Sequence, residues 1–296
     1  VMSITRANPL WNVTIPPKGT VKLPENPDLA RLRDPQVGFS VRVSEIIQGR
    51  SEPVPRFFID PSAVSGDTVT LTGENARHAS YSLRLAPGDR IKVCDQQTAY
   101  LCEMVSFDGE TATARILSAD PIDTEPPFAA RLYQALPKGD KLEHVIQKAT
   151  ELGAYEIVAF PSARCISKPD EKSLKKKLER WQKIAASAAE QSGRGRIPQV
   201  RVLGSYKEAL QEAAKADKPL MFYENEQAVT LKMALSSKSY HSVSLLTGPE
   251  GGLEEKEVAQ AREAGLQVCT LGKRILRCET APLCALSAVM YDAGEF

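Results

Sequence analysis

The stretch from Leu245 to Ala281 constrains the fold of this chain most, because it contains the same local pattern twice. A short apolar run at 243–246 predicts a buried strand, which leads into the glycine-rich turn 247–252. A second run at 266–271 predicts another strand, which leads into the turn 272–274, and a helix is expected between the two strands. Ligands of open α/β sheets bind beyond the carboxyl ends of the strands, where glycine lets the backbone approach them. We therefore expect an α/β domain with a ligand crevice at these two turns.

Length and composition leave room for two domains and exclude several classes of protein. The chain has 296 residues, of which 42% are apolar and 25% charged, with a formal net charge of +1. Its six cysteines form no C-x-x-C pair, so disulfides and a metal site are not expected, and a reducing cytoplasm fits best. No apolar run approaches the roughly 18 residues that cross a bilayer, and no signal-peptide core is visible.

Changes in pattern divide the chain into four segments. Residues 1–55 are rich in proline and have no sustained period, so they read as an extended or disordered extension. Short strands at 56–59, 68–71, 90–94, 99–107 and 111–117, with a helix at 74–83, predict a small β-barrel over 56–119. Residues 120–128 form a proline-rich linker. Residues 129–296 alternate strands and helices, which predicts a parallel sheet.

The first β-α-β unit of that last segment can be placed closely. Strands are expected at 130–136 and 155–160, with a helix at 141–152 between them. Asp140 followed by Glu143 predicts a capping box at the start of this helix. Lys138 lies in the turn before it and is a candidate substrate contact, although an ordinary turn explains the neighbouring glycine equally well. Further along, helices are expected at 173–191 and 281–291, and a strand is expected at 220–223.

A basic region suggests contact with a phosphate backbone. Residues 164–201 contain eleven lysines and arginines, Arg164 among them, against four acids. For Lys175, Lys176 and Lys177 the solvated face of a helix is the simpler interpretation. Arg194 and Arg196 differ because they flank a glycine at a helix end, and there we favour a pair of clamps on RNA phosphates.

Without further comparison the glycine turns remain ambiguous. A tight turn that binds nothing would explain the same glycines, and neither a G-x-G-x-x-G motif nor a Walker lysine is present. Glu250, Glu279, Arg274 and Arg277 supply charged groups beside the two turns. The residues alone therefore indicate an α/β domain with a ligand crevice and a small β domain.

Four motifs in order carry a resemblance to a known family. They are GPEGG at 248–252, LGKRILRCETA at 271–281, LPKGDK with KATELG at 136–153, and LERWQKIAASAAEQSGRGRIP at 178–198. Together they resemble the bacterial 16S ribosomal RNA uridine N3-methyltransferase family of the SPOUT superfamily, over residues 56–296, about four fifths of the chain. The resemblance implies a PUA-like barrel that helps to bind RNA, followed by an α/β domain with a C-terminal trefoil knot.

The resemblance also implies a cofactor, a partner and site residues. S-adenosylmethionine would lie in the knot, and the chain would form a homodimer that acts on 16S rRNA or the small ribosomal subunit. The residues that would hold the cofactor are Leu246, Thr247, Gly248, Pro249, Glu250, Gly251, Leu271, Gly272, Ile275, Leu276 and Ala281. Lys138, Arg164, Arg194 and Arg196 would contact the RNA.

Charge assigns roles within this implied site. Methyl transfer to N3 of uridine requires loss of a proton of high pKa, or a cation that stabilises the developing anion. Arg277 suits the second role, because a guanidinium is a poor base, and Glu250 or Glu279 could accept the proton. Cys278 and Cys284 stand where the family commonly has threonine and a small residue. The alternatives are a SPOUT methyltransferase acting on tRNA or a ribose 2′-hydroxyl, and a non-catalytic PUA-type RNA-binding protein.

Overall fold

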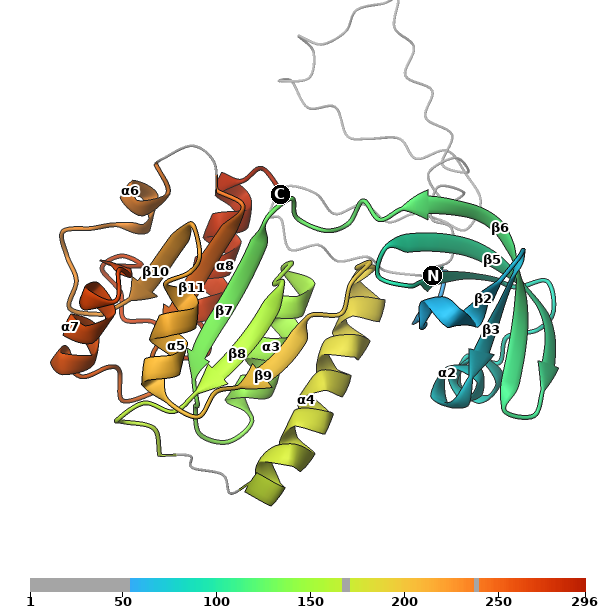
Figure 1. The fold of residues 1–296 in the computed structure, drawn as a ribbon, viewed down its shortest axis with the longest axis horizontal. Helices are drawn as coiled ribbons and strands as arrows, with labels where there is room; N and C mark the ends of the chain where they lie inside the picture. Colours follow the sequence, from blue (N-terminus) through green and yellow to red (C-terminus); the bar gives the residue numbers. More distant parts are fainter. Residues whose placement is uncertain (1–53, 167–170, 237–239) are drawn as a thin grey trace, which may run out of the picture. The chain divides into compact units, whose positions relative to one another are not determined.

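The computed structural model describes residues 54–296, except 167–170 and 237–239. The extension expected at 1–55 therefore lies almost entirely outside the described residues. The described part contains two six-stranded sheets, one mostly antiparallel and one fully parallel (Figure 1).

The first sheet has the order β1-β4-β5-β6-β3-β2. Its strands are β1 (Arg56–Phe58), β2 (Val64–Ser65), β3 (Thr68–Thr72), β4 (Arg90–Cys94), β5 (Thr98–Asp108) and β6 (Thr111–Pro121). The long β5–β6 hairpin turns at Gly109, whose φ of 57° suits glycine. Because the order ends at β1 on one side and β2 on the other, the sheet is open, and it forms a half-barrel where the strand spacing predicted a small β-barrel.

The helix expected at 74–83 is divided into two segments. An α-helix, α2 (Gly73–Arg77), continues into the π-helical turn η3 (His78–Ser82), and a short 3₁₀ turn, η2 (Pro61–Ala63), precedes β2. The half-barrel encloses its own apolar cluster, in which Phe57, Leu71, Ile91 and Met104 are almost completely buried. The strands are therefore held by packing on one face, as their alternating pattern predicted.

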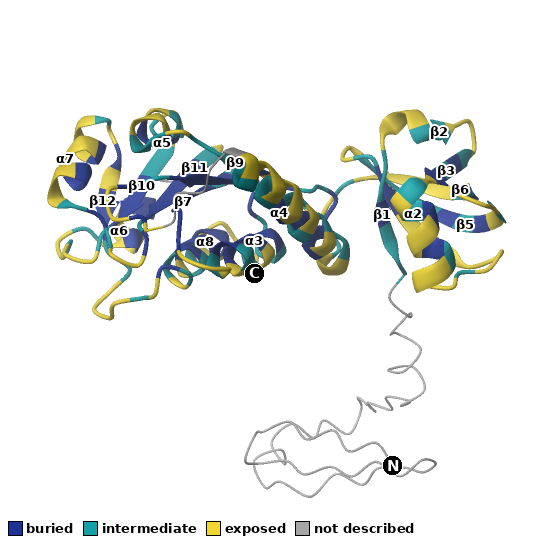
Figure 2. Cartoon of the chain, turned by 90° about the horizontal axis from the view of Figure 1, so that it is seen from below, coloured by how far each residue is buried: buried dark blue, intermediate teal, exposed yellow. Residues whose placement is uncertain are grey.

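The second sheet has the order β12-β10-β11-β7-β8-β9, and every pair is parallel. Its strands are β7 (Ala129–Ala135), β8 (Glu156–Phe160), β9 (Gln199–Val202), β10 (Lys218–Phe222), β11 (Ser242–Thr247) and β12 (Gln267–Cys269). The prediction of a parallel β-α-β unit is confirmed by the pairing of β7 with β8. All five residues of β8 are buried, as in the central strands of doubly covered sheets. Figure 2 shows β10 and β11 of the same sheet largely in the dark blue of buried residues.

Helices cover both faces of this sheet. They are α3 (Lys141–Glu151), α4 (Glu171–Ser192), α5 (Tyr206–Ala213), α6 (Leu231–Leu235), α7 (Glu255–Glu263) and α8 (Ala281–Asp292). In Figure 2 α5 lies on one face, and α3 and α8 pack side by side on the other. Since all strands are parallel, their carboxyl ends share one edge, which places the two glycine turns at the same edge.

The capping box expected at Asp140 is absent. Asp140 has φ −97° and ψ 9°, outside the extended region that an N-cap needs, and its side chain makes no capping hydrogen bond. The reciprocal arrangement occurs instead at α7, where the backbone N–H of Glu254 donates to Oε2 of Glu257 at 2.9 Å.

Three further facts bear on the class of protein. In the described ranges, no helix has the length and apolar character to cross a membrane. The same residues contain no group of three His, Cys, Asp or Glu side chains that could hold a metal ion. The six cysteines are free thiols, and Cys284 is the exposed one among them.

Candidate functional site at the carboxyl edge of the parallel sheet

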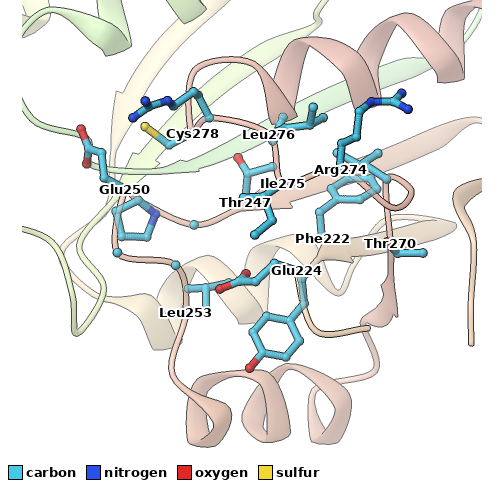
Figure 3. A pocket seen from close by; sticks show the side chains of 18 of the residues that line it. Phe222, Glu224, Thr247, Glu250, Leu253, Thr270, Arg274, Ile275, Leu276 and Cys278 are labelled. Carbon is cyan, nitrogen blue, oxygen red and sulfur yellow. The ribbon is translucent and has the colours of Figure 1, made fainter. Parts of the chain in front are cut away.

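A cavity of about 410 Å³ opens where β10, β11 and β12 end (Figure 3). Its walls come from three segments, 222–224, 247–253 and 270–278, together with Ala281 at the start of α8. Ligand pockets commonly measure ~300–1,000 Å³, so the cavity is large enough for a small cofactor. The two glycine turns thus line one cavity.

Most of the residues expected at a cofactor site line this cavity. They are Thr247, Gly248, Pro249, Glu250, Gly251, Leu271, Gly272, Ile275, Leu276 and Ala281. Arg277 lines it as well. Leu246 does not, because its side chain is buried in the core as part of β11. Glu279 is outside the lining and lies next to it, beside Lys141.

Buried polar contacts hold the first turn in place. Thr247 Oγ1 lies 2.7 Å from Oε1 of Gln134, and Nε2 of Gln134 donates to the carbonyl of Gly248 at 3.0 Å. Gln134 is fully buried at the end of β7, so this pair of bonds joins the turn to the neighbouring strand. At Gly248 a Cβ would lie 3.0 Å from Cγ of Leu253, which leaves little space for a side chain. The turn therefore presents backbone groups to the cavity.

A charged cluster stands beside the cavity. Nζ of Lys141 lies 2.9 Å from Oε1 of Glu250 and 3.7 Å from Oε2 of Glu279. The backbone N–H of Lys138 also donates to Oε1 of Glu250, at 2.9 Å. Lys141, at the start of α3, therefore connects the turn after β11 to the segment before α8.

These contacts determine the ionisation of both carboxyls. Burial raises the pKa of Glu250, but hydrogen bonds from Lys141 and from backbone amides outweigh it and hold that pKa below its usual value. The Cys278 thiol, which donates to Oε2 of Glu279 at 3.2 Å, lowers the pKa of Glu279 most, with help from a backbone amide and Lys141. Both carboxyls are therefore ionised at neutral pH, and both are weak bases.

The neighbouring thiol and guanidinium differ in exposure. Burial, together with the hydrogen bond to Glu279, raises the pKa of Cys278 to about 12, so the thiol stays protonated. Arg277 is exposed. Its carbonyl accepts hydrogen bonds from Thr280 and Ala281, each at 2.9 Å, which ties its backbone to the first turn of α8. Arg277 is thus an exposed cation on a fixed backbone.

The four residues expected to contact RNA fall into two groups. Lys138 and Arg164 lie at the carboxyl edge, where Nη1 of Arg164 donates to the carbonyl of Gly251 at 2.8 Å. Arg194 and Arg196 lie near the amino ends of β7 and β8, at the opposite edge. A strand of six residues such as β11 spans about 20 Å, so the two groups are well separated within one chain.

Arg194 is placed differently from the phosphate clamp that the sequence suggested. Its side chain is 5% exposed and forms an ion pair with Glu125 of the linker. Its Nη1 donates to the carbonyls of Thr150 and Ala154, at 3.1 and 2.7 Å. We therefore assign Arg194 a structural role. The guanidinium of Arg196, in contrast, is half-buried and stacks 3.7 Å from the ring centre of Tyr155.

Several residues of the cavity were not expected from the sequence. Phe222, the last residue of β10, forms one wall with Tyr223 and Glu224, and Leu253 and Thr270 complete others. The strand at 220–223 was predicted, but its position next to β11 was not. With that order known, the rule that ligands bind at carboxyl ends would have pointed to Glu224.

Comparison with known proteins agrees with this arrangement. A family described as "RNA methyltransferase domain" matches residues 124–290, and one described as "RNA methyltransferase PUA domain" matches residues 71–117. The ribosomal RNA small subunit methyltransferase E of Bacillus subtilis is 40% identical over 246 residues, which cover 80% of this chain and 96% of the relative. The protein of the same name from Synechocystis is 33% identical, over 79% of this chain and 76% of the relative.

A solved structure leads to the same family. The ribosomal RNA small subunit methyltransferase E of Neisseria gonorrhoeae, bound to S-adenosyl methionine, superposes with a TM-score of 0.72 at 37% identity, covering 80% of this chain and 97% of that one. Matches of this extent include both the half-barrel and the α/β domain. The chain therefore belongs to the ribosomal RNA small subunit methyltransferase E family, which combines a PUA domain with a SPOUT-type methyltransferase domain.

Proposed function

We propose that this protein transfers a methyl group from S-adenosylmethionine to N3 of a uridine in 16S rRNA. The observation that carries the proposal is the cavity at the carboxyl edge, in which the glycine turns after β11 and β12 meet beside an exposed arginine. Family membership supports the reaction class, and the relative solved with S-adenosyl methionine supports the cofactor.

The lining fits this cofactor. Backbone groups of 247–252 and 271–272 offer donors and acceptors to an adenosine, and Ile275, Leu276 and Leu253 offer apolar surface. When bound, the cofactor supplies an electrophilic methyl group on a sulfonium. The glycines at 248 and 272 allow the backbone to approach it closely.

We also propose that the segment around this cavity forms a trefoil knot. After β12, at one edge of the sheet, the chain runs past the turns after β10 and β11 and enters α8. α8 then packs against β11 and β7, in the middle of the sheet, and against α3 (Figure 1). A trefoil knot forms if the segment after β12 passes through the loop made by the earlier turns on its way to the centre of the sheet, and this passage is what we propose.

Arg277 has the principal chemical role in this proposal. Its guanidinium stabilises the negative charge that develops on the uridine as N3 loses its proton. Glu250 is the less suitable proton acceptor, because Oε1 is engaged by both Lys141 and the N–H of Lys138. Glu279 is the more available carboxylate, because its contact with Lys141 is longer, at 3.7 Å, although its Oε2 also accepts a hydrogen bond from the Cys278 thiol at 3.2 Å. Since its pKa is lowered, it takes the proton only with the help of the cation.

RNA contacts follow from the two cationic groups. Lys138 and Arg164 adjoin the cavity and would hold the phosphates of the target nucleotide. Arg196, at the other edge, would contact a more distant part of the RNA. The uridine must be unpaired to reach the cavity, as RNA bases that enter enzyme sites are.

A homodimer completes the proposal. α8 is apolar on nearly all sides, and Cys284 and Tyr291 are exposed on it while Ala288, on the same side, is half-buried. The Tyr291 side chain is 74% exposed. A helix that is apolar all round is normally buried, so a second copy of this chain is the expected cover for that side.

The test combines binding and methylation. Calorimetry should show that the protein binds S-adenosylmethionine; absence of binding would favour the non-catalytic alternative. Incubation with small ribosomal subunits, followed by mapping of the methylated atom, should identify N3 of a uridine. A methylated ribose 2′-hydroxyl, or tRNA as the preferred substrate, would instead support the other SPOUT reactions.

One variant tests the chemical role. Arg277→Ala should retain cofactor binding and lose roughly 100-fold or more in methylation rate, since groups that stabilise a developing anion contribute on that order. Arg277→Lys should recover part of the rate. Lys256→Ala, which removes an exposed cation from α7 outside the cavity, is the matched control. A wild-type rate in Arg277→Ala would refute the assignment.

A further inference from the structure

Glu224 is an acid in the wall of the cavity to which no role has been attached so far. It follows β10, the strand next to β11, so it stands at the carboxyl edge beside the glycine turn. It is exposed, and among the described residues no hydrogen bond or ion pair engages its carboxylate. Figure 3 shows its side chain reaching into the cavity near Leu253, on a different side from Glu250. Glu224 is therefore available to a ligand.

The neighbouring turn makes room for this carboxylate. A Cβ built on Gly252 would collide with Oε1 of Glu224 and lie 3.3 Å from its Cδ. Gly252 also has φ +69°, a conformation that favours glycine. The close approach of Gly252 and Glu224 keeps the carboxylate against the turn, where the backbone groups of the cavity are.

The charged residues of the cavity limit which groups of a ligand could bind the Glu224 carboxylate. Lys273, Arg274 and Arg277 line other parts of the wall, and none is paired with Glu224. An unpaired carboxylate accepts hydrogen bonds, so it would face the hydroxyl or amino donors of a ligand. In S-adenosylmethionine these donors are the ribose diol, the adenine amino group and the α-ammonium group.

The position of Glu224 in the sheet distinguishes among these donors. Glu250 and its ion-pair partner Lys141 lie on the side of the cavity near the carboxyl end of β7, whereas Glu224 lies near the carboxyl end of β10. These strands are two steps apart in the sheet, which is roughly 10 Å at ~4.8 Å per step. In the proposed function Arg277 acts at the reacting atoms, so the sulfonium and the amino-acid part of the cofactor would lie on the side of Glu250, Cys278 and Arg277. The nucleoside therefore extends toward Glu224.

We propose that Glu224 binds the ribose diol of the cofactor and is a specificity-determining residue for it. The inference rests on the proposed function. A carboxylate accepts two hydrogen bonds from adjacent hydroxyls, and an acid at the end of a neighbouring strand has this role in dinucleotide-binding sheets. Removal of a ribose hydroxyl from the ligand, or of the Glu224 carboxylate from the protein, should then have the same effect on binding affinity.

Calorimetry with S-adenosylhomocysteine and its 2′-deoxy analogue tests the proposal. Wild-type protein should prefer the ribose form by about tenfold to hundredfold, as expected for hydrogen bonds to a charged group. Glu224→Ala should bind the ribose form more weakly by a similar factor and no longer distinguish the two ligands. Glu224→Gln should be intermediate. Glu255→Ala, which removes an exposed acid of α7 outside the lining, should behave as wild type.

A second pair of variants tests the geometry. Gly252→Ala should weaken the preference for ribose, because the methyl group displaces the carboxylate. Gly265→Ala, with φ +95° and no atom within 4 Å of the added Cβ, reports the backbone strain alone and should retain the preference. Thermal unfolding confirms that each variant is folded.

Other outcomes would overturn the inference. If Glu224→Ala still preferred the ribose ligand as the wild type does, another group of the protein would be the one that binds the diol. If Glu224→Ala lost affinity for S-adenosylhomocysteine but not for 5′-methylthioadenosine, which lacks the amino-acid part, Glu224 would instead bind the α-ammonium group. Wild-type protein that binds none of these nucleosides would contradict the proposed function, and the inference with it.

Discussion

Replacement of Arg194 by alanine should lower the stability of the fold rather than weaken RNA binding directly. The guanidinium is 5% exposed, and it donates to Glu125 and to the carbonyls of Thr150 and Ala154. Its removal leaves a carboxylate and two carbonyls without their donor. Loss of one partner from a buried ion pair costs about 3–5 kcal/mol.

The expected magnitude lies at the lower end of that range. The Glu125 side chain is 21% exposed, and it keeps a hydrogen bond from the N–H of Gly195 at 3.0 Å, so water and the backbone recover part of the loss. We expect the free energy of unfolding to fall by about 3 kcal/mol. At about 2–4 °C per kcal/mol for a domain of this size, Tm should fall by ~6–12 °C.

Thermal and urea unfolding, followed by circular dichroism, measure this change. Arg196→Ala is the matched control, because Arg196 is two residues away and half-buried, and its stacking on Tyr155 contributes only about 0.5–1 kcal/mol. Arg196→Ala should instead weaken RNA binding and reduce its salt dependence by about one counterion. If Arg194→Ala kept the wild-type Tm and lost RNA affinity as Arg196→Ala does, the structural role of Arg194 would be wrong.

Three further predictions follow from the carboxyl edge. Glu250→Gln should destabilise the protein at pH 7, because an ionised carboxyl with a lowered pKa contributes stability that is lost on protonation. In urea unfolding the difference from wild type should decrease as pH falls below the ordinary carboxyl pKa of 4.5, and a difference that did not decrease with pH would argue against this. Iodoacetamide at pH 8 should label the exposed Cys284 in monomeric protein and leave Cys278 unmodified, since burial raises the pKa of Cys278 to about 12. Mass spectrometry identifies the labelled cysteine, and protection of Cys284 from labelling at high protein concentration would support the dimer. Glu257→Ala should lower the free energy of unfolding by about 1–3 kcal/mol, measured in urea, because the buried carboxylate accepts hydrogen bonds from the backbone of Ala163 and Glu254. Unchanged stability would show that water replaces the carboxylate as the acceptor.

Local sequence was sufficient for the features that depend on neighbours in the chain. Periodicity placed β4 at its observed bounds, and it predicted the parallel unit from β7 to β8. The two glycine turns could be predicted to meet because parallel strands end at one edge. The helix at 74–83 was only partly right, since its second half forms a π-helical turn.

Features that depend on distant partners could not be predicted in the same way. Arg194 in a glycine-rich turn resembles a phosphate clamp, and only Glu125, 69 residues away in sequence, makes it an internal ion pair. Gln134 is polar within an apolar strand, and its partners Thr247 and Gly248 are more than a hundred residues away. Glu224 became a candidate only when the sheet order placed β10 beside β11.

The order in which the cavity walls occur along the chain has a consequence for synthesis. The half-barrel and β7, β8 and β9 are complete before any wall of the cavity exists, since the first wall begins at Phe222 and the last ends at Ala281. A ribosome that stops before Phe222 therefore releases a product with the half-barrel and no wall of the cavity, and one that stops before Ala281 releases a product whose cavity is incomplete. Nonsense mutations across the last quarter of the gene should behave as null alleles, and a nascent chain cannot modify RNA until its terminal helix has emerged.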